Sequence, residues 1–161
     1  FTFDLIVDDD AQPQQVAAYL QQQIESALPD VKINIVIKPK KQRVLDCQQG
    51  NFELALARWG PDYADPMTYL SMWKTGNSNN YGLWSNAAYD ALLESATTGE
   101  AAADPQARWE ALHQAESIAV REMVIIPLYE KSNAMMTKHY VSGIEFHPVA
   151  IGRVYKNAAV V

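Results

Sequence analysis

Two carboxylates and two aromatic rings occur together in the segment 59–65, WGPDYAD, and these residues are the best suited in the chain to bind a ligand. Asp62 stands between Trp59 and Tyr63, and Gly60 follows the tryptophan directly. A carboxylate flanked by aromatic faces can bind a small cation such as an amine, because the charge and the ring faces both attract it. The structural alternative is that Asp62 caps the turn by accepting backbone hydrogen bonds, and that Trp59 closes the end of a sheet.

No catalytic or metal-binding motif is recognisable elsewhere in the sequence. His113, His139 and His147 lack the HExxH spacing and the cysteine partners of a zinc site. Gly-x-Ser-x-Gly, P-loop and Gly-x-Gly-x-x-Gly motifs are absent. The lone Cys47 cannot form an internal disulfide, so we interpret it as a small buried apolar residue. We therefore expect a binding protein with no catalytic residue, no metal and no cofactor.

The spacing of apolar residues predicts the elements that lead into this segment. Strands are predicted over 1–7, 31–37 and 52–58, and helices over 13–28 and 42–49. Asp8–Asp10 lacks the glycine and the glutamate of a calcium loop, and is interpreted as a cap and acidic first turn for the first helix. This β-α-β-α-β order is typical of a parallel sheet with covering helices. Strand 52–58 ends in the Gly-Pro loop, which is where α/β proteins place ligand sites.

In the second half of the chain, the residue pattern predicts helices that are followed by strands. Asp65-Pro66 is interpreted as a helix cap, and 76–82 as a polar loop. Ser85 is predicted to cap a helix that ends at Thr98-Gly99. A longer helix is predicted from Asp104-Pro105 to about Glu122, with a buried side formed by Trp109, Leu112, Ala115, Ile118 and Ala119. Strands are predicted over 123–129, where Pro127 indicates a sheet edge or a bulge, and over 132–140.

Composition limits the kind of protein this chain can be. Its 161 residues, 48% apolar and 20% charged, suit one globular domain with a substantial core. The formal charge of −6 disfavours nucleic acid as a partner, since phosphate binding needs a basic surface. Apolar runs such as 123–128 are too short to span a bilayer. Phe1 opens directly into a strand pattern, and no signal peptide is recognisable at this start.

A series of segments carries a resemblance that covers nearly the whole chain. They are the 59–65 loop, the 67–73 helix, NSNNYG at 77–82, WSN at 84–86 with YDALL at 89–93, the 108–116 helix and IPLY at 126–129. In this order and spacing they resemble the extracytoplasmic solute-binding proteins that serve peptide-importing ABC transporters, the oligopeptide- and dipeptide-binding family. Members often carry a basic residue just before the strand that leads into the loop, where this sequence reads DCQQG at 46–50.

The resemblance implies a fold, a function and a site. The fold would be α/β, one lobe of a two-lobed periplasmic-binding-protein-like (type II) fold with a mixed sheet flanked by helices, and 1–161 would be an excised C-terminal lobe. Asp62 would bind the α-ammonium group of a peptide, while Trp59 and Gly60 line the peptide track. The implied partners are a peptide, the permease subunits and the missing N-terminal lobe. A monomer outside the cytoplasm is expected, with any lipid anchor in the missing N-terminal part.

Two other functions use the same sequence features. Similar scaffolds bind oligosaccharides, nickel chelates or opines, although a carboxylate at position 62 favours a cationic end on the ligand. A signalling or adhesion protein could also keep this lobe and use it to contact another protein. An enzyme is not expected, because no catalytic motif is present.

Overall fold

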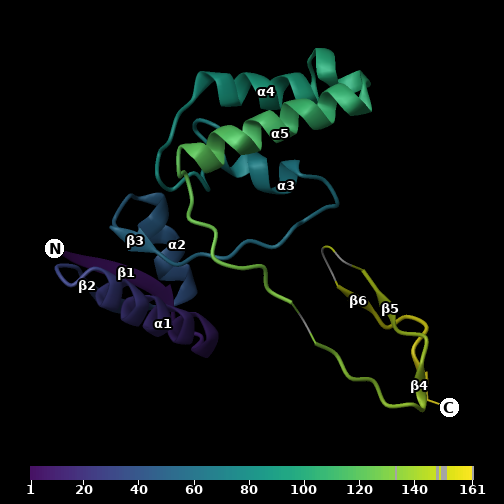
Figure 1. Ribbon diagram of the computed structural model, residues 1–161. Coiled ribbons are helices and arrows are strands. Elements are labelled where there is room, and N and C mark those ends of the chain that lie inside the picture. Colours follow the sequence, from purple (N-terminus) through teal and green to yellow (C-terminus); the bar gives the residue numbers. More distant parts are fainter. Residues whose placement is uncertain (133, 148, 150–151, 161) are drawn as a thin grey trace. The chain divides into compact units, whose positions relative to one another are not determined.

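The structure is a computed structural model that describes residues 1–132, 134–147, 149 and 152–160 (Figure 1). These residues form two compact units. The first unit contains Phe1–Trp59 and Gly76–Trp84, and the second contains Gly60–Thr75 and Ser85–Val161 apart from the residues that are not described. The chain therefore passes from one unit to the other at three points, after Trp59, Thr75 and Trp84.

The first unit is built on a three-stranded parallel sheet, as the β-α-β-α-β pattern predicts. Its strands are β1 (Thr2–Asp8), β2 (Lys32–Lys38) and β3 (Leu54–Ala55), in the order β2-β1-β3. The prediction of a third strand over 52–58 was too long. After Leu56 donates its N–H to the carbonyl of Ile6 at 3.0 Å, the described chain makes no further ladder bond beside β1.

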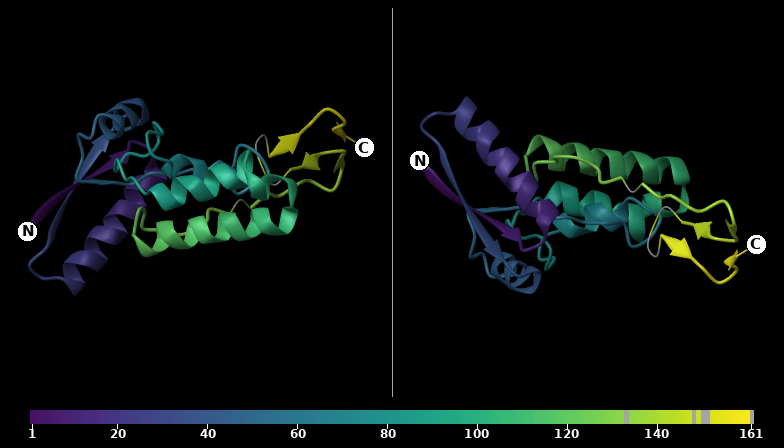
Figure 2. Two further views of the ribbon diagram at one scale, coloured as in Figure 1. Left: turned by 90° about the horizontal axis from the view of Figure 1, so that it is seen from above. Right: turned by 90° about the horizontal axis from the view of Figure 1, so that it is seen from below.

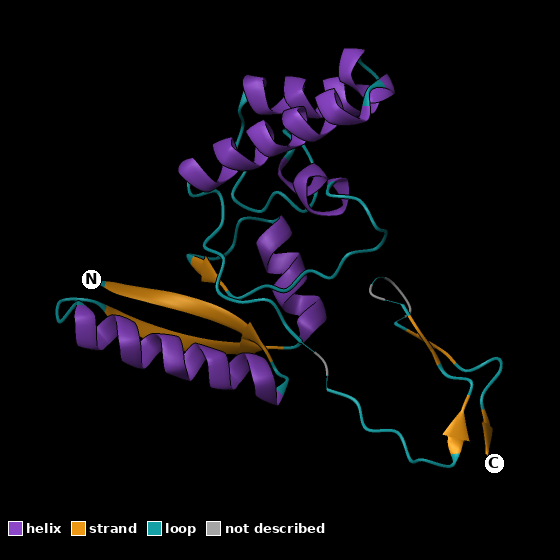
Figure 3. Ribbon diagram, turned by 45° about the vertical axis from the view of Figure 1, so that its right-hand side comes forward, coloured by secondary structure: helices purple, strands orange, loops and turns teal. Residues whose placement is uncertain are grey.

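Two helices cover this sheet on opposite faces (Figure 2). They are α1 (Ala11–Ala27), which lies along β1 and β2 (Figure 3), and α2 (Lys40–Gln48). The chain moves from β1 to β2 in one direction and from β2 past β1 to β3 in the other, and right-handed crossovers then place the two helices on opposite sides. Buried apolar side chains join α1 to the sheet, namely Leu5, Val7, Ala17 and Ile33.

The second unit is mainly helical. Its helices are α3 (Met67–Leu70), η1 (Ser71–Trp73), α4 (Ala87–Thr97), η2 (Glu100–Ala103) and α5 (Pro105–Arg121). Helices α4 and α5 pack side by side, with α3 against α5 (Figures 1 and 2). Tyr89, Leu93 and Leu112 are buried in this core, and the Tyr89 hydroxyl donates to the carbonyl of Leu70 at 2.6 Å.

The helix caps agree with the prediction for α5 and correct it for α4. Asp104 accepts the N–H groups of Gln106 and Ala107 at 2.9 and 3.3 Å, with Pro105 as the first helical residue. For α4 the prediction of Ser85 was wrong, because the cap is Asn86, whose side chain accepts two N–H groups at the start of the helix. Asparagine caps helices about as well as serine, so the sequence alone did not separate the two neighbours.

The predicted buried side of α5 is right for its small residues and for Leu112, only half right for Ile118, which is half-buried, and wrong for Trp109. That side chain is 60% exposed and lines an open groove on α5 that Pro66 and Tyr69 also line. A tryptophan at a helical spacing from buried residues is expected in the core, yet a residue at the margin of an apolar face can be left outside it.

The strands predicted over 123–129 and 132–140 are not found among the described residues; Asn133 lies outside them. The segment leaves α5 as a long loop (Figure 1), and residues 125–132 and 134–137 make no described hydrogen bond. A strand needs a neighbour, and the described chain places none beside this segment. Antiparallel pairs follow it instead, formed by β4 (Val141–Ser142) with β7 (Ala159–Val160) and β5 (Glu145–Phe146) with β6 (Arg153–Val154).

Among the described residues, no helix is both long enough and apolar enough to cross a membrane.

Candidate functional site

The three predicted ligand-binding residues lie in one continuous loop after β3. Trp59 is the last residue of the first unit before the chain enters the second, to which Gly60 and Asp62 belong. All three are exposed, with 43% of Trp59 accessible. Residues 57–61 make no described backbone hydrogen bond, so the N–H groups of 57–60 and the C=O groups of 57–61 remain available to another chain.

The carboxylate of Asp62 takes part in no hydrogen bond or ion pair among the described residues. Its backbone N–H donates to the hydroxyl of Thr68 at 3.0 Å, and Thr68 is buried in α3. The turn is therefore held by the threonine side chain and not by the aspartate side chain. The turn-capping alternative for Asp62 requires a carboxylate bonded to backbone N–H groups, which this loop does not have in the described structure.

The cap predicted at Asp65-Pro66 is right in position, because Pro66 is the N-cap of α3, but Asp65 lies one residue before it. Asp65 also fastens that helix to its neighbours. One carboxylate oxygen accepts the N–H of Met67 at 2.9 Å, and the other lies 2.8 Å from the guanidinium of Arg108 on α5. The hydrogen bond from Arg108 lowers the pKa of Asp65. Arg108 also donates to the carbonyl of Ala96 at 3.0 Å. These contacts fix the position of α3, and through Thr68 they fix the turn at Asp62.

Charged residues gather where β1 and β3 end in the first unit. Asp8 and Arg43 form an ion pair of 2.8 Å in which each side chain is only 4% exposed. Arg58 lies 3.3 Å from a carboxylate oxygen of Asp10 and 4.0 Å from one of Asp8. Asp10 occupies the predicted N-cap position of α1, but its side chain makes no cap hydrogen bond. The first turn of α1 also contains no acidic residue, so both the side-chain cap and the acidic first turn were wrong. Its carboxylate faces Arg58 instead.

This cluster lies at the point where the strand order reverses. Strands β1 and β3 are neighbours, and the helices that follow β1 and precede β3 lie on opposite faces of the sheet. Ligands of open α/β sheets bind outside the carboxyl ends of the strands at such a point. The loop that carries Trp59 starts from this edge of the first unit.

Sequence reasoning missed Asn80. It lies in the loop predicted to be too polar for the core, yet it is only 3% exposed. Its side-chain amide donates to the carbonyl of Trp84 at 2.7 Å and accepts the N–H of the same residue at 3.2 Å. The sequence carries no signal for this arrangement, because any of the neighbouring Asn and Ser residues could have faced inward.

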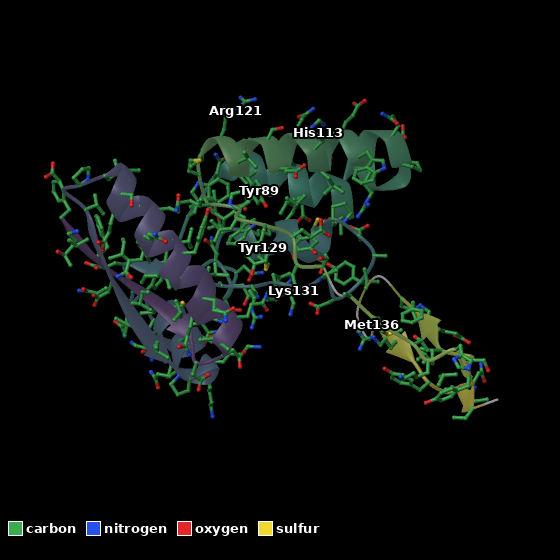
Figure 4. The ribbon with its side chains drawn as sticks, turned by 60° about the horizontal axis from the view of Figure 1, so that its bottom comes forward. Tyr89, His113, Arg121, Tyr129, Lys131 and Met136 are labelled. Carbon is green, nitrogen blue, oxygen red and sulfur yellow. The ribbon has the colours of Figure 1, made fainter. Side chains whose placement is uncertain are left out.

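The remaining candidates are Cys47 and the histidines. Cys47 is buried, as predicted, and burial raises its pKa. His113 projects from the exposed side of α5 (Figure 4), and His139 contacts the ring of Tyr140 edge-on. No group of three or more metal-binding side chains occurs in the described part of the chain.

Comparison with known proteins gives consistent matches. The family model described as bacterial extracellular solute-binding proteins, family 5 Middle, matches residues 1–81. The dipeptide-binding protein of Lactococcus lactis subsp. cremoris is 33% identical over 150 residues, which are 93% of this chain and 27% of the relative.

Solved structures extend the likeness to the fold. The substrate-binding domain of an oligopeptide ABC transporter from Bacillus anthracis superposes with a TM-score of 0.85 at 34% identity, covering 99% of this chain and 31% of the other. Listeria monocytogenes OppA bound to peptide gives a TM-score of 0.83 at 27% identity, covering 99% and 30% of the two chains. The chain thus spans about a quarter to a third of the length of these proteins.

Proposed function

The chain belongs to the bacterial extracellular solute-binding proteins of family 5, and from that premise we propose that residues 1–161 are the C-terminal lobe of a longer protein that binds peptides for an ABC importer. The longer protein would close two lobes over a peptide by a hinge motion and release it to the permease. It would act outside the cytoplasm as a monomer, with any lipid anchor in the part that precedes this lobe. It would bind its ligand without catalysing a reaction.

The observation that carries the proposal is the carboxylate of Asp62, which is exposed and makes no described contact. A carboxylate in this state can pair with the α-ammonium group of a peptide at no cost to an existing hydrogen bond. Trp59, three residues earlier on the same loop, offers an aromatic face to the ligand. Both features suit a ligand that carries a free amine.

The backbone of residues 57–61 supports a peptide over other amines. Its N–H and C=O groups have no described partner, so an extended peptide can pair with them as an additional strand. Main-chain pairing gives affinity without reading side chains, and a protein that uses it accepts many peptide sequences. Gly60 adds no side chain that would hinder the approach of the peptide backbone.

The proposal is tested by Asp62→Ala in the full-length protein, using calorimetric titration with free-amine and N-acetylated forms of one peptide. Removing the partner of a buried ammonium costs about 2 to 5 kcal/mol, so the free-amine peptide should bind roughly 30-fold to several thousand-fold more weakly. The acetylated peptide should bind the parent protein poorly and lose little further affinity in the variant.

Asp30→Ala is the matched control, because Asp30 is an exposed carboxylate at the amino end of β2, at the other edge of the sheet. Its affinity for both peptides should equal that of the parent. If Asp62→Ala left the preference for the free amine intact, Asp62 would not bind the peptide amine and the assignment of the ligand would fall with it.

A further inference from the structure

The loop between β3 and α3 is attached to the described structure at few points. The last hydrogen bond to the sheet is donated by the N–H of Leu56 to the carbonyl of Ile6. The next backbone N–H with a described acceptor is that of Asp62, which donates to the hydroxyl of Thr68. Between these points, Arg58 is the only residue of 57–61 with any described hydrogen bond or ion pair. Within the first unit, Arg58 is therefore the residue through which the described contacts can orient Trp59.

The guanidinium of Arg58 is held by residues that follow β1. One terminal nitrogen lies 3.3 Å from Asp10 and 4.0 Å from Asp8, and the other lies 3.5 Å from the side-chain oxygen of Gln12. Asp8 is fixed in turn by its buried pair with Arg43. Arg58, Asp8, Asp10 and Gln12 are termed the Arg58 clamp. The clamp links the end of β1 and the start of α1 to the start of residues 56–66, which are termed the ligand loop.

The charges of the Arg58 clamp balance, and its outer side chains are too exposed for the clamp to contribute much to folding stability. Asp8 is already paired with Arg43, so Arg58 and Asp10 balance each other. The side chains of Arg58 and Asp10 are 38% and 66% exposed. Exposed pairs of this kind contribute little to folding stability, because solvent screens the charges and ordering the side chains costs entropy.

We propose that Arg58 is a positioning residue for ligand binding: held by Asp10 and Asp8, it fixes the backbone of the ligand loop so that Trp59 is presented in one orientation. This inference rests on the proposed function only in requiring that the loop binds the ligand. It does not require the ligand to be a peptide. Preorganised loops bind more tightly because less conformational entropy is lost on binding. Loss of the clamp therefore weakens binding without unfolding the protein.

The test is a double-mutant cycle in the full-length protein with Arg58→Gln, Asp10→Asn and both together. If the two residues act through each other, each single change weakens peptide binding about 5- to 10-fold and the double variant is no weaker than either. Asp9→Asn is the matched control, because Asp9 is an exposed neighbour whose carboxylate has no described partner. It should change affinity by less than about 2-fold.

Three outcomes of the cycle overturn the inference. The first is additive losses, which indicate that Arg58 and Asp10 act independently. The second is a loss in Arg58→Gln with none in Asp10→Asn, which indicates that Arg58 acts on binding without Asp10. The third is a fall in melting temperature of more than about 5 °C in either single variant, which shows a structural contribution larger than an exposed pair supplies.

A measurement without ligand separates this inference from the proposed function. Fluorine NMR of the full-length protein labelled with 5-fluorotryptophan, with the Trp59 signal identified from Trp59→Phe, should give one narrow resonance for Trp59 in the parent and in Asp9→Asn. The same signal should broaden or split in Arg58→Gln and Asp10→Asn. An unchanged signal overturns the clamp even if peptides bind as proposed, and a changed signal supports it even if they do not.

Discussion

The ion pair between Asp8 and Arg43 is the most deeply buried pair of charges in the described structure. Each side chain is 4% exposed and the two atoms lie 2.8 Å apart. Buried pairs contribute little net stability when formed, but removing one partner leaves the other charge without compensation. Removing one partner is therefore expected to lower the folding stability by more than the intact pair contributes to it.

We expect Asp8→Ala to destabilise the protein by about 3 to 5 kcal/mol, because Arg43 would remain charged in a buried position. Urea unfolding followed by tryptophan fluorescence measures the loss. The double variant Asp8→Leu with Arg43→Met should recover most of it, since apolar side chains replace both charges. A loss below about 1 kcal/mol in the single variant would show that water reaches Arg43.

At the scale of single residues, the sequence predicts where a residue lies in an element better than which residue it contacts. Asp10 was correctly placed at the start of α1, because aspartate before a helical pattern is a local signal. Its contact with Arg58 joins positions far apart in the chain, and no local pattern encodes such a pair. Asp62, Trp59 and Gly60 remain predictions as ligand-binding residues, although the structure gives their exposure and surroundings.

Helix α3 is held in its unit by the Asp65–Arg108 ion pair and by the Tyr89 hydroxyl, which donates to the carbonyl of Leu70. It is one turn long, and Asp65 at its start is bound to Arg108 of α5. The hydrogen bond from Arg108, with that from the Met67 N–H, places the pKa of Asp65 below its unfolded value. A carboxylate of this kind adds stability above an unfolded pKa of about 3.9, and the contribution is lost as pH falls through the lower folded pKa.

Asp65→Asn should therefore lower stability at neutral pH by about 1 to 2 kcal/mol, in the range of a partly exposed charged hydrogen bond. The difference from the parent should shrink below about pH 4, where the parent carboxylate also becomes protonated. Thermal melts between neutral pH and pH 2.5 test this. Asp30→Asn should follow the parent at every pH, and a constant gap between Asp65→Asn and the parent would contradict the assignment.

Element predictions succeeded where the signal was local and failed where the partner was absent. Strands β1 and β2 and helices α1, α2 and α5 lie within a few residues of the predicted bounds, because their periodicity is continuous. The pattern over 123–129 also indicates a strand, but pairing depends on a neighbour. The described chain supplies none, so the same residues form a loop.

At the scale of the whole molecule, the segment after α5 exposes apolar side chains, which the proposed longer protein would be expected to cover. Ile126 and Leu128 are 68% and 46% exposed, and Tyr129 and Lys131 lie on the same extended segment (Figure 4). The chain spans only about a third or less of its relatives. If the chain is one lobe of a longer protein, as proposed, a strand of the other part is expected to cover these side chains and pair with their backbone.

We accordingly expect the amides of Ile126 and Leu128 to exchange at least about 100-fold more slowly than unstructured amides in the full-length protein. These two N–H groups lie on one edge of an extended chain, whereas Pro127 leaves a gap in the donors of the other edge. Hydrogen exchange with residue-resolved mass spectrometry measures this. Protection equal to that of an unstructured peptide would show that the segment stays unpaired in the longer protein.

The path of the chain between the two units limits how this protein can be divided. Because residues 76–84 belong to the first unit and 60–75 to the second, neither unit is encoded by one uninterrupted stretch of gene. Recombination at any single codon between 60 and 84 would split at least one unit, and a protease that cuts once there would leave both still tethered. Because the second unit also continues from 85 onward, exchange of material with related genes is expected to have transferred both units together, with the breakpoints outside them.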